Sequence, residues 1–281
     1  MKKVNIKKVT ICGYGLIGGC IALDLLASKK KIEIVAYDRK SVLEKIKKDS
    51  NHNVSTEKSF KKAVQDSDMI ILSAPHNANE EMLYKLHNNK NIQNCLILDT
   101  GAVKSPITQI AKALDFSNGV QFLPTHPMAG REKAGFKNAS TKLFQEHAWY
   151  ISDDIILSYE NQQKIAWLIQ TVKALRVHIS SSAHDELVSQ ISHLPQLIST
   201  LLGSQTKPEL IPLAGPGLRS MLRLSGSPYS VWQEIITENK TEIIEALKIY
   251  KNNLDDVIKK IKNDESLEKI FKDSSRSYTC L

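Results

Sequence analysis

The chain has 281 residues, of which 42% are apolar and 24% are charged, and its formal net charge is +8. This composition is ordinary for a globular protein, and the length favours two domains. No apolar stretch is long enough to cross a bilayer, and the start lacks the pattern of a secretory signal, so we expect a cytoplasmic protein. Because the lysines are scattered among acidic and apolar residues, the charge favours solvated helix faces over a nucleic-acid or membrane site.

The cysteines form neither a CxxC pair nor a metal-like spacing with histidines. We interpret Cys12, Cys20, Cys95 and Cys280 as reduced thiols in the core or on the surface. The sequence therefore predicts no metal site.

The first half of the chain alternates short β-branched apolar runs with amphipathic helical patterns. This order is typical of an α/β Rossmann domain, a doubly wound and mostly parallel sheet with helices on both faces. The predicted strands are residues 9–13, 33–38, 69–74, 95–99, 121–124 and 149–152. The helical patterns between them cover residues 16–28, 42–48, 59–65, 79–87 and 106–114.

The second half changes to a 3.6-residue period from about residue 161, with only a brief strand pattern at 177–180. We therefore predict a Rossmann domain at 1–156 and an all-α domain at 157–281. The long apolar helical patterns exceed what one small helical layer can bury; they are 190–202, 231–250 and 254–261. This excess predicts a homodimer that forms through the helical domain.

A GxGxxG motif follows the first predicted strand directly and opens a helix, and this context gives the motif its meaning. Gly13 permits the tight turn, Gly15 lets the backbone approach a pyrophosphate, and Gly18 lets the helix pack on the strand. The backbone N–H groups at Leu16 and Ile17, in the first turn of the helix, are expected to face the phosphates. The alternative is a glycine-rich turn that binds no ligand.

Two further segments are expected to line the same cofactor site. Asp38 ends the second predicted strand, at the separation from the glycines where an acidic residue binds ribose hydroxyls. This predicts NAD over NADP, although Arg39 could pair with a 2′-phosphate or stack on adenine. The alternative role for Asp38 is a strand-end cap. Ser73, Ala74 and Pro75 end another strand at the same edge of the sheet.

Polar motifs follow the later strands, where ligands meet a sheet of this kind. They read Asp99-Thr100-Gly101-Ala102-Val103-Lys104 and Thr125-His126-Pro127-Met128-Ala129-Gly130. The helical half adds Ala183-His184-Asp185, Ser192-His193-Leu194-Pro195, and Gly217-Leu218-Arg219-Ser220-Met221-Leu222-Arg223 followed by Ser227-Pro228 and Trp232. Together with the glycine motif, these segments resemble the prephenate and arogenate dehydrogenases of tyrosine biosynthesis over nearly the whole chain.

The resemblance implies an NAD-dependent oxidative decarboxylation of prephenate to 4-hydroxyphenylpyruvate. It gives His126 the role of the base that holds the ring hydroxyl and takes its proton as hydride leaves. Arg223 is implied to bind a substrate carboxylate with its planar guanidinium, and Arg219, one turn earlier, is the second choice. Ser192 matches a serine near the substrate, and a homodimer is implied as well.

The chain departs from the family pattern at two positions. Ala102, two residues after Thr100, stands where the family usually has a serine near the catalytic histidine and the cofactor. We assign Thr100 and Ala102 to the cofactor site. Either Thr125, Ser105 or a water takes over the serine's role, or the catalytic histidine is less tightly oriented. Gln196 stands where many prephenate-preferring members carry a histidine, and it can hydrogen-bond the substrate but cannot become cationic. The choice between prephenate and arogenate therefore stays open.

Other readings of the chain remain. Other two-domain dehydrogenases, such as β-hydroxyacid dehydrogenases and pyrroline-carboxylate reductases, share the architecture but are not expected to combine the HPMAG and SHLP motifs. A non-catalytic NAD-binding sensor is the alternative from another class, and Ala102 is the best argument for it. His184 is interpreted as packing at a helix start, and His193 as packing or bridging helices. We expect neither a fused chorismate mutase nor an appended regulatory domain.

Overall fold

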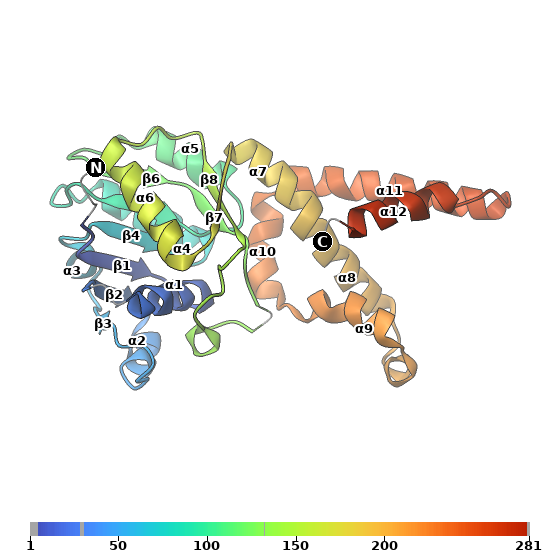
Figure 1. The fold of residues 1–281 in the computed structure, drawn as a ribbon, viewed down its shortest axis with the longest axis horizontal. Helices are drawn as coiled ribbons and strands as arrows, with labels where there is room; N and C mark the ends of the chain where they lie inside the picture. Colours follow the sequence, from blue (N-terminus) through green and yellow to red (C-terminus); the bar gives the residue numbers. More distant parts are fainter. Residues whose placement is uncertain (1–4, 29–30, 132, 280–281) are drawn as a thin grey trace.

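The structure is a computed structural model that describes residues 5–28, 31–131 and 133–279. Its N-terminal half is built on a six-stranded parallel sheet with the strand order β3-β2-β1-β4-β5-β6 (Figure 1). The strands are β1 (Lys8–Cys12), β2 (Glu33–Tyr37), β3 (Ser55–Thr56), β4 (Met69–Leu72), β5 (Leu96–Asp99) and β6 (Gln121–Leu123). The strand order reverses between β1 and β4, and doubly wound sheets bind ligands at the carboxyl ends of the strands beside such a point.

Helices cover both faces of this sheet, as predicted. They are α1 (Leu16–Ala27), α2 (Lys40–Ile46), α3 (Phe60–Val64), α4 (His76–His87), α5 (Ser105–Ala113) and α6 (Tyr159–Val172). Successive strand side chains point to opposite faces, so Ile71 packs in a core with α1, α2 and α6, while Ile70 packs with α4 and α5. The apolar strand runs are therefore buried on both sides, as in other parallel sheets.

A smaller sheet with the order β7-β8-β9 adjoins the first. It contains β7 (Thr125–Pro127), antiparallel to β8 (Ala148–Ser152), which runs parallel to β9 (Leu175–Ile179). The strand predicted at 149–152 thus belongs to a separate sheet. β3 and β7 were not predicted, because runs of two or three residues show no periodicity.

The second half is helical and projects away from the main sheet (Figure 1). Its helices are α7 (Ser181–Val188), α8 (Leu194–Gln205), α9 (Pro216–Leu222), α10 (Tyr229–Glu238), α11 (Lys240–Lys262) and α12 (Glu268–Tyr278). Three short helical segments join them, namely the π-helical η2 (Ser189–His193) and the 3₁₀ segments η3 (Pro208–Leu213) and η4 (Arg223–Gly226). A further 3₁₀ turn, η1 (Phe136–Asn138), lies in the first half.

One helical prediction is corrected at residue 239. The continuous pattern at 231–250 is split into α10 and α11, and Asn239 lies between them. Asn239 is buried, and its side-chain amide donates to the Asp185 carbonyl oxygen at 2.8 Å and lies 3.2 Å from His193 Nδ1. These tertiary hydrogen bonds favour the break over the local periodicity.

The packing bears on where the two domains meet. α6 packs against α1 and β5, and β9 pairs with β8, so both belong with the first half. The division at 156–157 was placed where the periodicity changes, but α6 is itself an amphipathic helix of the Rossmann half. We propose a division near residue 180 instead.

Two sequence expectations concern the chain as a whole. Among the described residues, no helix is both long and apolar enough to span a bilayer. Cys12, Cys20 and Cys95 are free and buried, as interpreted, whereas Cys280 lies outside the described residues.

Candidate active site

The glycine motif forms the turn from β1 into α1. Gly13 has φ +90°, and a Cβ there would lie 2.4 Å from the backbone nitrogen of Ala74, so no other residue fits. A Cβ on Gly18 would lie 2.5 Å from the Gly13 carbonyl oxygen. Around Gly15 there is open space, and this residue precedes α1 without a side-chain cap on the helix N-terminus. The turn therefore combines close packing on one side with room for a ligand on the other.

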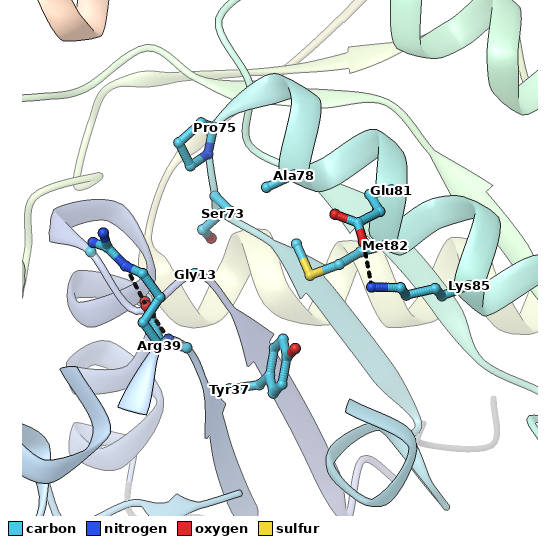
Figure 2. Close-up of a pocket in the computed structure, with 12 residues that line it drawn as sticks. Gly13, Tyr37, Arg39, Ser73, Pro75, Ala78, Glu81, Met82 and Lys85 are labelled. Atoms are coloured by element: carbon cyan, nitrogen blue, oxygen red, sulfur yellow. Dashed lines mark hydrogen bonds and ion pairs between the residues drawn. The ribbon is translucent and has the colours of Figure 1, made fainter. Parts of the chain in front are cut away.

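A cavity of about 510 Å³ opens beside this turn, at the carboxyl ends of β1, β2 and β4 (Figure 2). The predicted cofactor residues that line it are Gly13, Gly15, Asp38, Arg39, Ser73, Ala74 and Pro75. Tyr37 and four residues of α4 complete the lining and were missed by the sequence reasoning; those of α4 are Ala78, Glu81, Met82 and Lys85. The signal that could have found them is that this helix follows the predicted cofactor segment at 73–75 directly, so its first turns lie beside the cavity.

Asp38 lies at the end of β2 with its carboxylate largely covered. Its Oδ2 accepts a hydrogen bond from the Tyr14 backbone N–H at 2.7 Å, and its Oδ1 accepts from the Arg39 N–H at 2.6 Å. The Arg39 side chain is 86% exposed, and its Nε lies 3.8 Å from Asp38 Oδ1. Asp38 therefore holds the glycine turn and lines the cavity at the same time.

The cavity fits a dinucleotide. The Ser73 hydroxyl oxygen is buried without a hydrogen-bond partner among the described residues, although Ser73 lines the cavity. A buried hydroxyl of this kind is expected to find its partner on a ligand. Asp38 can accept from ribose hydroxyls, and the open turn at Gly15 admits a pyrophosphate.

His126 lies in β7 and is half-buried. Its Nδ1 is 3.0 Å from Nε2 of His184, and the Tyr150 ring lies against both imidazoles, with centroids 6.4 Å and 5.2 Å away. Desolvation by the surrounding atoms holds the pKa of His126 well below its usual range, and the charges of His184, Lys104 and His193 act in the same direction. His126 is therefore a neutral imidazole at physiological pH, the form that can accept a proton.

His184 continues this contact to a carboxylate. Its Nδ1 lies 2.8 Å from Asp185 Oδ1, and Asp185 also accepts from the backbone N–H groups of Lys104 at 2.8 Å and Ser105 at 2.7 Å. Burial raises the pKa of Asp185, but the hydrogen bonds from His184 and from the two residues of the loop lower it further than burial raises it. The interpretation of His184 as a packing residue missed this link. The Ala-His-Asp segment was the signal, because it places two polar side chains at a buried helix start.

The loop after β5 is anchored by a buried ion pair. Lys104 Nζ binds Asp99 Oδ2, the same carboxylate accepts from the Gly101 N–H at 2.9 Å, and its Oδ1 accepts from the Thr125 N–H at 3.0 Å. Burial lowers the pKa of Lys104, although the charge of Asp99 opposes this. One carboxylate thus fixes both the loop that carries Ala102 and the strand that carries the catalytic histidine.

The two predicted cofactor residues of this loop lie outside the large cavity. Ala102 lines a smaller cavity of about 140 Å³ between the loop and α10, whereas Thr100 lines neither cavity. Of the groups considered as substitutes for the missing serine, the Thr125 hydroxyl donates to the Asp99 carbonyl oxygen. The Ser105 side chain hydrogen-bonds Asp185, as its backbone N–H does. Leu16 and Ile17 lie in the first turn of α1, as predicted.

The predicted substrate residues come from the helical half. Ser192 is half-buried in η2, and Arg223 is exposed at the start of η4, which packs on α8. Gln196 is buried on α8, and its amide donates to the Leu224 carbonyl oxygen at 2.8 Å and to Thr200 Oγ1 at 3.1 Å. The structure therefore ties Gln196 to the segment that carries Arg223.

His193 stands at the junction of the helices. It ends the π-helical turn, and Pro195 follows in the next turn, where it cannot donate a backbone hydrogen bond. The ring packs edge-on against Trp232 with centroids 5.9 Å apart and meets the amide of Asn239. Burial lowers the pKa of His193 to about 4. As predicted, His193 bridges helices.

Two stretches of the chain match sequence profiles of one family. Residues 21–181 match the nucleotide-binding domain of prephenate dehydrogenase, and residues 180–273 match its dimerization domain. The chain belongs to the prephenate dehydrogenase family. Its Rossmann half is therefore the nucleotide-binding domain of that family, its helical half is the dimerization domain, and the predicted fold class is confirmed.

Individual relatives and solved structures that are similar to this chain carry names of the same family. The prephenate dehydrogenase of Lactococcus lactis subsp. cremoris is 28% identical over 278 residues, which cover 96% of this chain and 76% of the relative. A crystal structure of prephenate dehydrogenase from A. aeolicus, in complex with hydroxyphenyl propionate and NAD+, has a TM-score of 0.85 at 22% identity and covers 99% of each chain. Synechocystis arogenate dehydrogenase has a TM-score of 0.79 at 22% identity, over 97% of this chain and 99% of its own. The solved structures share the fold.

Proposed function

We propose that this family member is a prephenate dehydrogenase, which uses NAD to convert prephenate to 4-hydroxyphenylpyruvate and carbon dioxide in tyrosine biosynthesis. The observation that carries the proposal is the contact of His126 Nδ1 with His184 Nε2 at 3.0 Å, beside the anchored loop after β5, in a domain whose large cavity is lined by the glycine turn and Asp38. Family membership and the Lactococcus lactis relative support it.

The cofactor is held by the residues of the large cavity. NAD, when bound, supplies the hydride acceptor. The open turn at Gly15 admits the pyrophosphate, Asp38 accepts hydrogen bonds from the adenosine ribose, and the buried Ser73 hydroxyl gains a partner. We propose the same site for Thr100 and Ala102, on the nicotinamide side.

His126 handles the proton of the reaction. The substrate's ring carbon loses hydride while its hydroxyl proton passes to His126, so that the C–O bond becomes a carbonyl. The ring carboxylate then leaves as carbon dioxide, and the electron pair of the broken C–C bond moves through the ring to the carbonyl oxygen. This oxygen takes the proton back from His126, so the ring becomes an aromatic phenol and His126 is neutral again. Because the substrate itself provides this driving force, the protein mainly positions groups and excludes water.

The helical half is proposed to hold the rest of the substrate. Prephenate is a dianion, and the planar guanidinium of Arg223 suits bidentate binding of one carboxylate. Ser192 and Gln196 are proposed to hydrogen-bond the substrate from the neighbouring helix. The enzyme acts as a homodimer through its dimerization domain, and the proposal includes a cytoplasmic location, where NAD is available.

Arogenate is the second candidate substrate, alone or together with prephenate. Arogenate carries an ammonium where prephenate carries a keto group, and Gln196 supplies an amide rather than an ionisable imidazole near that end. The Gln196 amide is already bonded to the Leu224 carbonyl, which leaves its carbonyl oxygen as the group that could accept from an ammonium.

The test is the formation of NADH by the purified full chain, with prephenate and arogenate supplied separately. Turnover of prephenate supports the proposed function, turnover of arogenate alone selects the second candidate, and turnover of both indicates dual specificity. Binding of NAD without turnover of either substrate would contradict both and favour a sensor.

A further inference from the structure

We infer that His184 and Asp185 set the tautomer of the catalytic histidine, so that His126 keeps Nδ1 protonated and presents an unprotonated Nε2 to the substrate. This inference rests on the proposed function for its catalytic consequence, and on hydrogen-bond geometry for the tautomer. His184 and Asp185 act as positioning residues, because in this structure they contact His126 and its neighbours rather than the cavities.

The positions of the protons on the two histidines follow from the hydrogen bonds of the Asp185 carboxylate. Asp185 already accepts from the backbone N–H groups of Lys104 and Ser105, and an ionised carboxylate can only accept. The third contact, 2.8 Å from Oδ1 to His184 Nδ1, therefore requires a proton on that nitrogen.

The contact between His184 and His126 fixes the tautomer of His126. A neutral His184 with a proton on Nδ1 has a lone pair on Nε2, which lies 3.0 Å from His126 Nδ1. His126 must then donate from Nδ1, so its own lone pair is on Nε2. When Nε2 takes the substrate proton, the cation that forms on His126 is stabilised through His184 by the carboxylate.

The surroundings keep this arrangement rigid. His184 and Asp185 are 0% and 3% exposed, and the Tyr150 ring lies edge-on to His184. The charged or titratable groups that face the pair from other elements are Lys104 and His193; Lys104 is bound to Asp99, and desolvation favours neutral His193. The Asp185 carbonyl oxygen also accepts from the Asn239 amide, so the start of α7 is fixed to the break between α10 and α11.

This chain of contacts also accounts for the alanine at position 102. The resemblance gives the residue at this position a role in hydrogen bonding near the catalytic histidine, which Ala102 cannot fill. The Thr125 hydroxyl donates elsewhere, to the Asp99 carbonyl. The bond from His126 Nδ1 to His184 holds the imidazole from its other side, so the base remains oriented without a hydroxyl at Ala102.

The direct test is ¹⁵N NMR of the full chain labelled at its histidines, which shows which ring nitrogen carries a proton. The His126 signals are assigned by their absence from His126→Asn protein. The expected spectrum of the wild type at neutral pH has the proton on Nδ1 of His126. A proton on Nε2 instead would overturn the inference, and this readout requires no catalytic activity.

Variants of the positioning residues give the second readout. In Asp185→Leu, His184 Nδ1 loses its acceptor, so the His126 proton is no longer fixed on Nδ1. The kcat is expected to fall about 10²-fold or more with KM within about threefold. His184→Leu is expected to lose a similar factor. His184→Gln keeps a donor toward Asp185 and an acceptor toward His126, so it is expected to retain kcat within about tenfold.

The matched control is Asp154→Asn. Asp154 also binds the start of α7, by accepting from the Ser181 backbone N–H at 2.7 Å, and it is paired with Lys112. Its loss is expected to lower stability while the His126 tautomer stays unchanged. If Asp185→Leu leaves the tautomer and kcat as in wild type, or if Asp154→Asn moves the tautomer equally, the inference is wrong. The expected tautomer in a wild type that turns over no substrate would support the relay and reject the proposed function.

Discussion

The two halves of the molecule differ in how completely they bury their own apolar side chains. In the Rossmann half, every residue of β4 and β5 is buried, with helices on both faces. In the helical half, α9, α10 and α12 contain no buried residue among those described, and α11 buries only Ile243 and Ala246. Large apolar side chains such as Leu213 and Phe271 are 84% and 69% exposed there.

The two halves therefore differ in whether one chain alone completes the apolar core. The first half has a finished core, and several of its polar site groups have partners within the chain, such as Asp99 with Lys104. The second half exposes an apolar stripe on α11, made of Leu247, Tyr250, Leu254, Ile258 and Ile261 at helical spacing. As the dimerization domain of its family, it finishes its core only with a second copy. The cofactor site is thus built by one half, and the proposed substrate residues sit in the half that needs a partner.

The largest effect on turnover is expected from a change in the Rossmann half. His126→Asn removes the proton acceptor but leaves the cavity residues in place, so turnover is expected to fall about 10²- to 10⁴-fold with unchanged NAD affinity. Steady-state kinetics and a binding titration with NAD measure the two quantities. Unaffected turnover would remove His126 from the mechanism.

Charged residues on the apolar stripe of α11 are expected to prevent the helical half from pairing with a second copy. Leu254→Asp together with Ile258→Asp is expected to weaken the dimer by about 10²-fold or more, because each buried aliphatic side chain contributes about 1.5–3 kcal/mol. Sedimentation over a concentration series measures the effect. Ile156→Asp is the control, since Ile156 is 90% exposed in the Rossmann half and is expected to leave the dimer intact. Equal effects of both changes would contradict the comparison.

The helical half is also expected to contribute to substrate binding. Arg223→Ala removes a charge-assisted carboxylate contact and is expected to raise the prephenate KM about 10²-fold with a smaller change in kcat. Arg219→Ala is the control, because Arg219 donates to the carbonyl oxygens of Ala214 and Ile211 within its own segment. An effect at Arg219 but not at Arg223 would exchange the two roles.

The junction of the helices at His193 is expected to weaken in acid. His193 has a folded pKa of about 4 against an ordinary 6.5, so the unfolded chain binds the proton first as the pH falls. The contribution of His193 to stability is therefore complete above pH 6.5 and is lost toward pH 4, by about 2 kcal/mol between pH 8 and pH 5. Urea unfolding at these two pH values measures it, and the wild type should lose about that much more than His193→Gln. An equal loss in both proteins would be the contrary result.

The smallest expected effect concerns the cofactor site of the Rossmann half. Asp38 is expected to repel a 2′-phosphate, so kcat/KM for NADP is expected to be about tenfold below that for NAD. Arg39→Ala is expected to widen this difference, because it removes a guanidinium beside Asp38 that could pair with the phosphate. Parity of NAD and NADP in the wild type would mean that Arg39 dominates.

The sequence predicts those features that depend on local pattern. The strands and helices of the Rossmann half, the glycine turn and the position of Asp38 follow from periodicity and motif context. The break at Asn239 and the link from His126 to Asp185 were not predicted, because both depend on hydrogen bonds between residues 46 to 58 positions apart. The start of α4 was predicted three residues too late, since the polar first turn of that helix gives no apolar signal. Its cavity lining at 81–85 lies within the predicted helix, but the pattern does not show which face of that helix meets the cavity.

The central claim is that oxidation and decarboxylation of prephenate are coupled at His126. The most direct measurement follows labelled carbon dioxide from prephenate labelled in the ring carboxylate, together with NADH, in the wild type with and without NAD. The account predicts one carbon dioxide for each NADH, and release without NAD no faster than in a protein-free control. NAD binding without either product, or carbon dioxide release that does not require NAD, would contradict it.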